Sequence, residues 1–368
     1  MYSKKLHEHS YPQGHPFNTS RAKKTRDIIN SMGMLDGKNN VEVPPEPADT
    51  VTLEKFHTAR YLQALKTVSK GDWDSEALNM GLGTGDCPVF EGLYEHAVLA
   101  AGATLKGAKL LLDKDFDIAF NTSGGFHHAM PERAAGFCYI NDMALACIVL
   151  AEHGKRVLYL DVDVHSGDGV STFFYDRADV MTISFHENPR FIFPGTGFED
   201  EIGSGDGKGY CVNVPLPIGT FDEAYMTAFN EIAVPLIRAY KPDTIVFELG
   251  ADALAGDLLA HLHLTNNVYA DIINHLLTLE LPILSTGGGG YNFENTVRAW
   301  ALAWTVFTQS EQDMRLGIGG VLMESTDWQG GLRDRALQVS QRQRNTVLPA
   351  LQATIERVRE NIFPCHGL

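Results

Sequence analysis

The sequence predicts an α/β fold in which a mostly parallel sheet carries helices on both faces. Short apolar segments typical of strands alternate with helical segments from residue 117 onwards, which favours such a sheet. Polar side chains also cluster directly after the predicted strands, where ligands bind in open α/β sheets. With no internal repeat and no break in composition, we expect residues 1–368 to form a single catalytic domain.

The first third of the chain is predicted to be mainly helical. Apolar residues recur at helical spacing over residues 20–34 and again over 53–68, with a proline-rich loop at 44–47 between them. The glycine-rich residues 75–89 indicate a long surface loop, a type of segment that often has a function. Residues 91–114 are rich in Ala and Leu and predict a long helix.

The remainder of the chain predicts alternating strands and helices. We expect strands at residues 117–121, 156–164, 180–185, 211–216, 244–249 and 282–285. Helices are expected between and after them, at residues 141–153, 221–240, 266–279, 297–307 and 348–361. The polar residues 309–338 are expected to pack loosely.

Charge and cysteine content exclude several functions. Thirty Lys and Arg against 46 Asp and Glu give a formal net charge of −16, which repels nucleic acid and attracts cationic substrates. No apolar run approaches the roughly 18 residues of a membrane span, and residues 1–15 lack the apolar core of a signal peptide. The five Cys are scattered without a CxxC pair, which argues against a cysteine zinc site and predicts a reducing, cytoplasmic location.

Candidate metal ligands follow two of the predicted strands. Asp161, Asp163 and His165 alternate, so on a strand they would share one face. Ionisable groups on an otherwise apolar strand are costly unless they are paired or bind a metal, and Asp and His are normal ligands of zinc and iron. Asp252 follows the strand at 244–249 and, taken alone, is better explained as a helix N-cap. Together, two Asp and one His leave a coordination position open for water, whereas the alternative is a buried hydrogen-bond network.

Two further segments carry groups suited to catalysis. His127 and His128 follow a glycine turn, and a His with a near-neutral pKa can serve as general base or acid, although a surface pair is an equal alternative. Asp161 and Asp168 could orient these imidazoles. The run Gly287–Gly290 lets the backbone approach the site, and the hydroxyl of Tyr291 could stabilise an oxyanion.

These segments resemble the class I histone deacetylase family, especially its bacterial acetoin-utilisation-type members. The matching motifs, in order, are GHPFN (14–18), FHTARYL (56–62), NTSGGFHHAMPERAAGFCYIND (121–142), LYLDVDVHSGDGV (158–170), FPGTG (193–197), LGADALAGD (249–257) and GGGGYNFENTVRAW (287–300). The resemblance implies an arginase/deacetylase fold with an eight-stranded sheet. It also implies zinc-dependent hydrolysis of an acyl-lysine amide on a protein substrate.

The resemblance also assigns roles to individual residues. Asp163, His165 and Asp252 match the zinc ligands, with Fe²⁺ as an alternative metal, and His128 matches the main general base and acid. His127 is mostly electrostatic in this scheme, Tyr291 binds the carbonyl oxygen, and Asp161 and Asp168 match the carboxylates that orient the two His. The matches to substrate-binding positions are the tunnel walls Gly136, Phe137 and Phe193, the rim carboxylate Asp86, and Arg21 behind the pocket that receives acetate.

Two structural potassium sites are implied as well. The nearer one matches Asp161, Asp163, His165, Ser184 and Phe185, and the farther one matches Phe174, Arg177, Val180 and Tyr210.

Three other functions are weighed against this one. A binuclear manganese ureohydrolase would need an Asp where Gly250 stands, and a non-catalytic acyl-lysine binder would not need the His pair. An acetylpolyamine amidohydrolase is chemically almost identical, but the long insertion typical of such enzymes is absent from this sequence. The acyl chain, the natural substrate and the oligomeric state are left open by the sequence.

Overall fold

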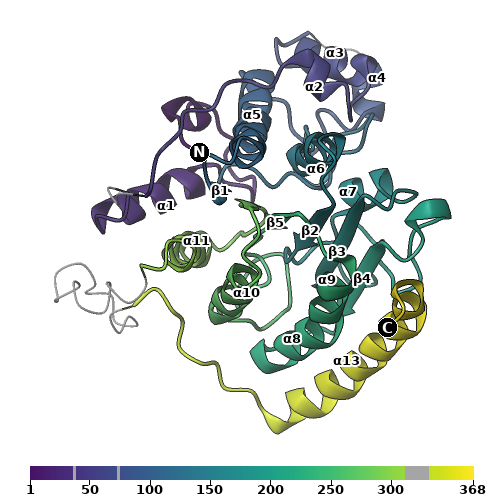
Figure 1. The fold of residues 1–368 in the computed structure, drawn as a ribbon. Coiled ribbons are helices and arrows are strands. Elements are labelled where there is room, and N and C mark those ends of the chain that lie inside the picture. Colours follow the sequence, from purple (N-terminus) through teal and green to yellow (C-terminus); the bar gives the residue numbers. More distant parts are fainter. Residues whose placement is uncertain (36–38, 73–74, 311–330) are drawn as a thin grey trace.

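A computed structural model describes residues 1–35, 39–72, 75–310 and 331–368 of the chain (Figure 1). Its centre is a six-stranded sheet in the order β1-β6-β5-β2-β3-β4, and every neighbouring pair is parallel. The strands are β1 (Ile118–Asn121), β2 (Val157–Asp161), β3 (Val180–Glu187), β4 (Cys211–Leu216), β5 (Thr244–Glu248) and β6 (Ile283–Thr286). The predicted α/β class is therefore confirmed, and each strand coincides with one predicted segment.

The eight strands implied by the resemblance are wrong for the described residues, which form six. Only the six segments with a short, nearly continuous apolar run pair in the sheet. The polar N-terminal segment lacks such a run, and its residues Lys4–His7 form the short 3-10 helix η1 instead.

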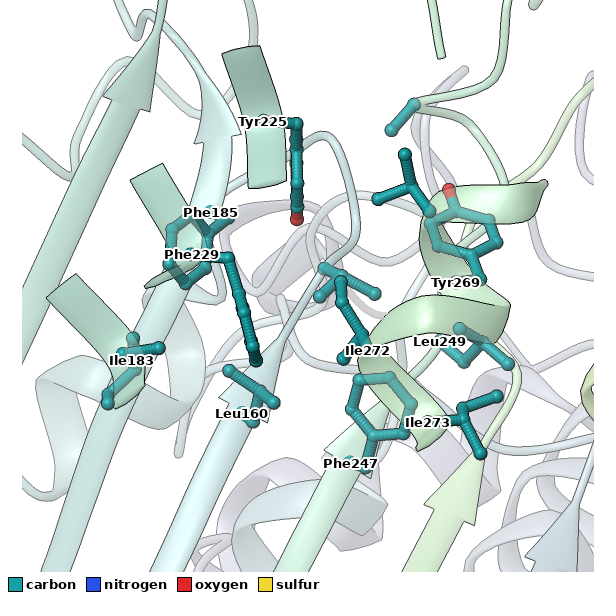
Figure 2. Packing of buried hydrophobic residues seen from close by; sticks show 14 of the residues in the cluster. Leu160, Ile183, Phe185, Tyr225, Phe229, Phe247, Leu249, Tyr269, Ile272 and Ile273 are labelled. Carbon is teal, nitrogen blue, oxygen red and sulfur yellow. The ribbon is translucent and has the colours of Figure 1, made fainter. Parts of the chain in front are cut away.

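Helices cover both faces of the sheet, as predicted. Leu158 and Leu160 of β2 pack into a cluster with the C-terminal helices, whereas Val157 and Tyr159 pack into a second cluster with α5 (Leu93–Leu112) and α6 (Asp142–Glu152). Figure 2 shows the first of these faces, where strand residues such as Leu160 and Phe247 meet the side chains of the covering helices. This alternation buries both sides of each central strand.

The remaining helices comprise those predicted from the sequence and several short ones that were not predicted. They are α1 (Ser20–Ser31), α2 (Thr50–Leu53), α3 (Ala59–Val68), α4 (Ser75–Asn79), α7 (Asp168–Phe173), α8 (Asp222–Ala228), the π-helical η3 (Phe229–Ala233), α9 (Val234–Tyr240), α10 (Asn267–Leu277), α11 (Phe293–Phe307) and α13 (Gln341–Ile362), with the short 3-10 helices η2 (Gly205–Gly207) and η4 (Phe363–His366). The single helix predicted for 53–68 is wrong in detail, because Thr58 caps a new helix by accepting a hydrogen bond from the Tyr61 N–H.

Two further predictions concern surface segments. The loop predicted for 75–89 contains the short helix α4. Most of the polar segment 309–338 lies outside the described residues. No helix in the described part of the chain combines the length and the apolar character needed to cross a membrane.

The strand order creates a switch point between β2 and β5. From β2 the chain continues to β3 and β4 on one side of the sheet, whereas from β5 it continues to β6 on the other side. In open α/β sheets a crevice forms at such a point, beyond the carboxyl ends of the strands. The segments that follow β2 and β5 carry Asp161–Asp168 and Asp252, so the topology brings the predicted metal ligands together.

Candidate metal and catalytic centre

Asp163, His165 and Asp252 converge at the switch point. His165 Nδ1 lies 3.1 Å from Asp163 Oδ1 and 3.1 Å from Asp252 Oδ2. All three side chains are buried. Backbone N–H groups fix the carboxylates, since Gly289 donates to Asp163 Oδ2 at 2.7 Å and Val164 donates to Asp252 Oδ1 at 2.9 Å.

The expectation that Asp161, Asp163 and His165 share one face of a strand is wrong, because β2 ends at Asp161. Beyond it, the N–H of Asp163 binds Asp161 Oδ1 at 3.0 Å, and the N–H of His165 binds Asp163 Oδ1 at 2.9 Å. Asp side chains that bind the backbone two residues on compete with the strand ladder and turn the chain. Asp161 therefore points to the His pair, whereas Asp163 and His165 point to the metal site.

The glycines around this centre pack directly against the carboxylates of Asp163 and Asp252. A Cβ at Gly289 would lie 1.9 Å from Asp252 Oδ2, and a Cβ at Gly250 would lie 2.1 Å from Asp163 Oδ2. Any larger residue at either position would displace a ligand. The sequence prediction that the Gly287–Gly290 run allows a close backbone approach is thus confirmed for Gly289.

These three residues fit a zinc ion. Two carboxylates and one imidazole are a normal catalytic donor set, and their ligand atoms all lie within 4.8 Å of one another. Burial and the negative charge of Asp163 together raise the pKa of Asp252 to about 7. A cation between the two carboxylates would relieve this repulsion, and the donor chemistry also suits Fe²⁺.

His127 and His128 enter the same centre and are not a surface pair. Both are buried, and their Nε2 atoms lie 3.0 Å apart. His128 Nδ1 lies 2.7 Å from Asp168 Oδ1, and His127 Nδ1 lies 2.9 Å from Asp161 Oδ2. Each imidazole therefore has the carboxylate partner that the sequence suggested for it.

The two imidazoles differ in charge. Burial and the positive charge of His127 together lower the pKa of His128 to about 4. Burial also disfavours a charged His127, but the carboxylates of Glu248 and Asp161 outweigh it and hold the pKa of His127 well above its usual value. At neutral pH His128 is then a neutral base beside a cationic His127.

Buried polar residues that the sequence reading missed hold the His-bearing loop. Asn141 donates from its side chain to the carbonyls of His127 at 3.1 Å and Ala129 at 3.0 Å. Asp142 accepts hydrogen bonds from the N–H groups of Gly125 at 3.0 Å and Phe126 at 2.8 Å. The sequence signal for this role is the polar pair Asn141 and Asp142 at the start of an apolar helix. Because such residues usually only cap a helix, the pair did not stand out.

Tyr291 is positioned by the loops on either side of it. Asp257 Oδ2 accepts the Tyr291 N–H at 2.7 Å, and the ring centroid of Tyr291 lies 6.3 Å from that of His165. The buried Arg21 donates to the carbonyls of Gly288, at 3.1 Å, and of Gly290. Arg21 also borders a cavity of about 10 Å³, roughly the space of one water. It therefore ties down the segment that presents Tyr291.

Aromatic rings surround the approach to the centre. The Phe193 ring lies edge-on to His128 at 4.9 Å between centroids, and the Phe137 ring lies edge-on to Tyr291 at 5.7 Å. Gly136 donates its N–H to Asp86 Oδ2 at 2.7 Å, which ties the exposed Asp86 to the Phe137 segment. The residues predicted as tunnel wall and rim thus lie close to His128 and Tyr291.

This fold and centre match a known family. The histone deacetylase domain model matches residues 15–307. The chain belongs to the histone deacetylase family. Histone deacetylase 3 of Oryza sativa is 38% identical over 305 residues, which is 82% of this chain and 59% of that protein. Histone deacetylase RPD3 of Saccharomyces cerevisiae is 37% identical over 303 residues, or 82% of this chain and 69% of that protein.

Solved structures agree with this family membership. The crystal structure of a histone deacetylase homologue from Aquifex aeolicus superposes with a TM-score of 0.82 at 28% identity, covering 97% of this chain and 98% of that one. A histone deacetylase homologue complexed with SAHA gives a TM-score of 0.83 at 28% identity, with the same coverage. The chain spans 59 to 63% of the length of the first five curated relatives.

The residues assigned to potassium by the family resemblance lie in two groups. Asp161 is paired with Ser184 across the β2–β3 ladder, so the nearer group is contiguous. In the farther group, the Arg177 N–H binds the Phe174 carbonyl at 3.1 Å, and the Tyr210 carbonyl accepts from Thr182 at 2.9 Å. Both groups thus lie beside β2 and β3, the half of the sheet that also leads into Asp163 and His165.

Proposed function

We propose that this chain is a zinc-dependent amidohydrolase that removes acyl groups from lysine side chains of proteins. The observation that carries the proposal is the buried metal-ligand triad Asp163, His165 and Asp252 beside a His pair with its own carboxylates. A metal binder without catalysis would have no need for a proton-transferring pair. A zinc ion held by the triad would supply Lewis-acid chemistry, polarising the amide carbonyl and lowering the pKa of water.

The side chains of this chain supply the proton transfers. His128, neutral at pH 7, takes the proton of the attacking water at Nε2 and later gives it to the departing lysine amine. Asp168 holds the His128 ring through Nδ1. His127, which the neighbouring carboxylates keep cationic, stabilises negative charge that develops beside it. Tyr291 donates a hydrogen bond from its hydroxyl to the oxygen of the former carbonyl. Burial raises the pKa of this phenol, so the hydroxyl keeps its proton.

The opening of the site suits a lysine side chain. Gly136, Phe137 and Phe193 would contact the four-carbon stem, and the carboxylate of Asp86 would bind backbone N–H groups of the substrate at the rim. A net charge of −16 attracts a protein segment rich in Lys. Arg21, which donates to the carbonyls of Gly288 and Gly290, would lie behind the pocket that receives the released acetate.

A single metal is supported by the geometry at Gly250. A second metal of the ureohydrolase type would need an Asp there, yet even a Cβ would meet Asp163 Oδ2 at 2.1 Å.

We further propose that K⁺ binds the two groups of residues described above, that residues 1–368 act as one catalytic domain, and that the protein is cytoplasmic. The five free cysteines support that location. We also propose that the chain is of the bacterial acetoin-utilisation type within this family.

The deciding experiment combines substrate turnover with metal content. Peptides with acetyl-, lactyl-, butyryl- and decanoyl-lysine, together with acetylated polyamines, are assayed on a preparation whose zinc and iron are measured. Turnover of the peptides with about one metal per chain is expected. Turnover of polyamines alone would assign the chain to the acetylpolyamine amidohydrolases instead. Bound metal without turnover of any substrate would contradict the hydrolase proposal.

A further inference from the structure

The His127 imidazole faces a second carboxyl group that the proposed mechanism does not use. Glu248 is the last residue of β5, is fully buried, and pairs with Asp161 across the β2–β5 ladder. Its Oε1 lies 3.1 Å from His127 Nδ1, while Asp161 Oδ2 lies 2.9 Å from the same nitrogen. One ring nitrogen is therefore flanked by two carboxyl groups from two neighbouring strands.

Tyr159 closes this group of side chains into a ring. Its buried hydroxyl lies 2.6 Å from Asp161 Oδ2 and 2.8 Å from Glu248 Oε2. A hydroxyl carries one proton and an ionised carboxylate only accepts, so both contacts are hydrogen bonds only if one carboxyl is protonated. The hydroxyl and the two carboxyl groups therefore form one buried group, in which Asp161 also accepts hydrogen bonds from His127 and from the N–H of Asp163.

We propose that Glu248 is a positioning residue for His127. A ring held only through Asp161 could pivot about that hydrogen bond, whereas contacts to Asp161 and Glu248 together define the direction of Nδ1–H. The opposite nitrogen, Nε2, then stays directed at His128, 3.0 Å away. Glu248 acts through the imidazole and lies on its far side from His128, so it affects turnover rather than substrate binding. The inference rests on the proposed role of the His pair.

Two substitutions in the zinc-loaded chain of residues 1–368 separate the polar contacts of Glu248 from space filling. Glu248→Leu fills the site but removes both contacts, and we expect kcat to fall about 10- to 100-fold, as for other residues that orient catalytic His side chains. KM and zinc content are expected to stay within about twofold. Glu248→Gln is expected to recover kcat to within about threefold, because its amide oxygen keeps the contact with His127 Nδ1 and its amide nitrogen donates to Tyr159.

A matched control and a spectroscopic readout complete the test. Thr244→Val removes a buried hydroxyl, bonded to the Pro282 carbonyl at 3.1 Å, from the other end of the same strand and should leave kcat unchanged. In proton NMR, the low-field His127 Nδ1–H resonance, assigned by its loss in His127→Ala, should move in Glu248→Leu and be largely restored in Glu248→Gln.

The inference is overturned if Glu248→Leu keeps its kcat or leaves that resonance in place. A Leu variant that loses kcat, KM and zinc together, or a Gln variant as impaired as Leu, would equally overturn it, since both outcomes indicate a structural role. A wild-type protein without turnover of any acyl-lysine peptide would contradict the proposed function itself. The resonance would still report on the position of His127 in that case.

Discussion

Among single residues, Tyr291 is the one whose role can be separated most cleanly from metal binding. Its hydroxyl is not part of the ligand triad, yet its ring lies 6.3 Å from the His165 ring between centroids. Tyr291→Phe should therefore keep its zinc while kcat falls about 10²- to 10³-fold, the usual cost of losing one oxyanion donor. Steady-state kinetics with metal analysis on the same samples tests this, and undiminished turnover would remove Tyr291 from the mechanism.

Gly250 offers a residue-scale test of how tightly the metal site is enclosed. A Cβ at this position would lie 2.1 Å from Asp163 Oδ2, so Gly250→Ala has to displace a ligand. We expect the zinc affinity, measured by competition with a chromogenic chelator, to fall at least about tenfold. Gly85→Ala is the control, because nothing lies within 4 Å of its Cβ. Equal affinities in the two variants would show that the site adapts.

The sequence was informative wherever a motif carried the chemistry. Asp163, His165 and Asp252 were predicted to meet, and the structure brings them together. Glu248 and Tyr159 were missed, because a lone Glu at the end of an apolar strand and a Tyr inside another have no distinctive spacing. Only the pairing of β2 with β5 makes them neighbours.

At the scale of elements, apolar runs and long periodic segments predicted the strands and the main helices. The boundaries and short elements were harder, because local hydrogen bonds decide them. β2 stops at Asp161 since the Asp side chains bind the backbone that follows. The helices α4 and α7 have too few residues to show a periodic pattern.

The helix α5 carries a prediction about acid stability. His96 is 5% exposed, neither ring nitrogen has a hydrogen-bond partner, and burial lowers its pKa to about 4. Because the unfolded chain binds a proton near pH 6.5 and the folded chain does not, this His destabilises the fold increasingly as pH falls from 6.5 towards 4. His96→Leu should therefore gain stability over wild type by up to about 1.4 kcal/mol per pH unit in that range.

Urea unfolding of both proteins at pH 8, 6.5 and 5 measures this difference. A difference in unfolding free energy that does not change with pH would contradict the assignment of a neutral, buried His96.

For the whole molecule, the metal should act as part of the fold. The triad joins the segment after β2 to the segment after β5, and both carboxylates are buried. An ion that binds only the folded chain adds about 4 kcal/mol of stability at a thousandfold excess over its Kd. Zinc-loaded protein should therefore unfold at a higher urea concentration than protein dialysed against a chelator, and coincident unfolding curves would argue against a metal at this position.

Composition and the alternation of elements predicted the α/β architecture of the whole molecule, whereas the number of strands followed from a resemblance and was wrong. The order of the strands could not be predicted from the chain, because it depends on contacts between distant segments. The centre of the site at the β2–β5 boundary depends on that order.

The order β1-β6-β5-β2-β3-β4 also has a consequence for how the protein is made. During synthesis β1 and β2 emerge early, yet they are separated in the finished sheet by β6 and β5, which emerge last. Until then β1 has no partner in the sheet and the edge of β2 that faces β5 is unpaired, and exposed strand edges are prone to aggregation. A nascent chain that has not yet released the residues after β5 also lacks Asp252, so the proposed zinc site is complete only after most of residues 1–368 have been made.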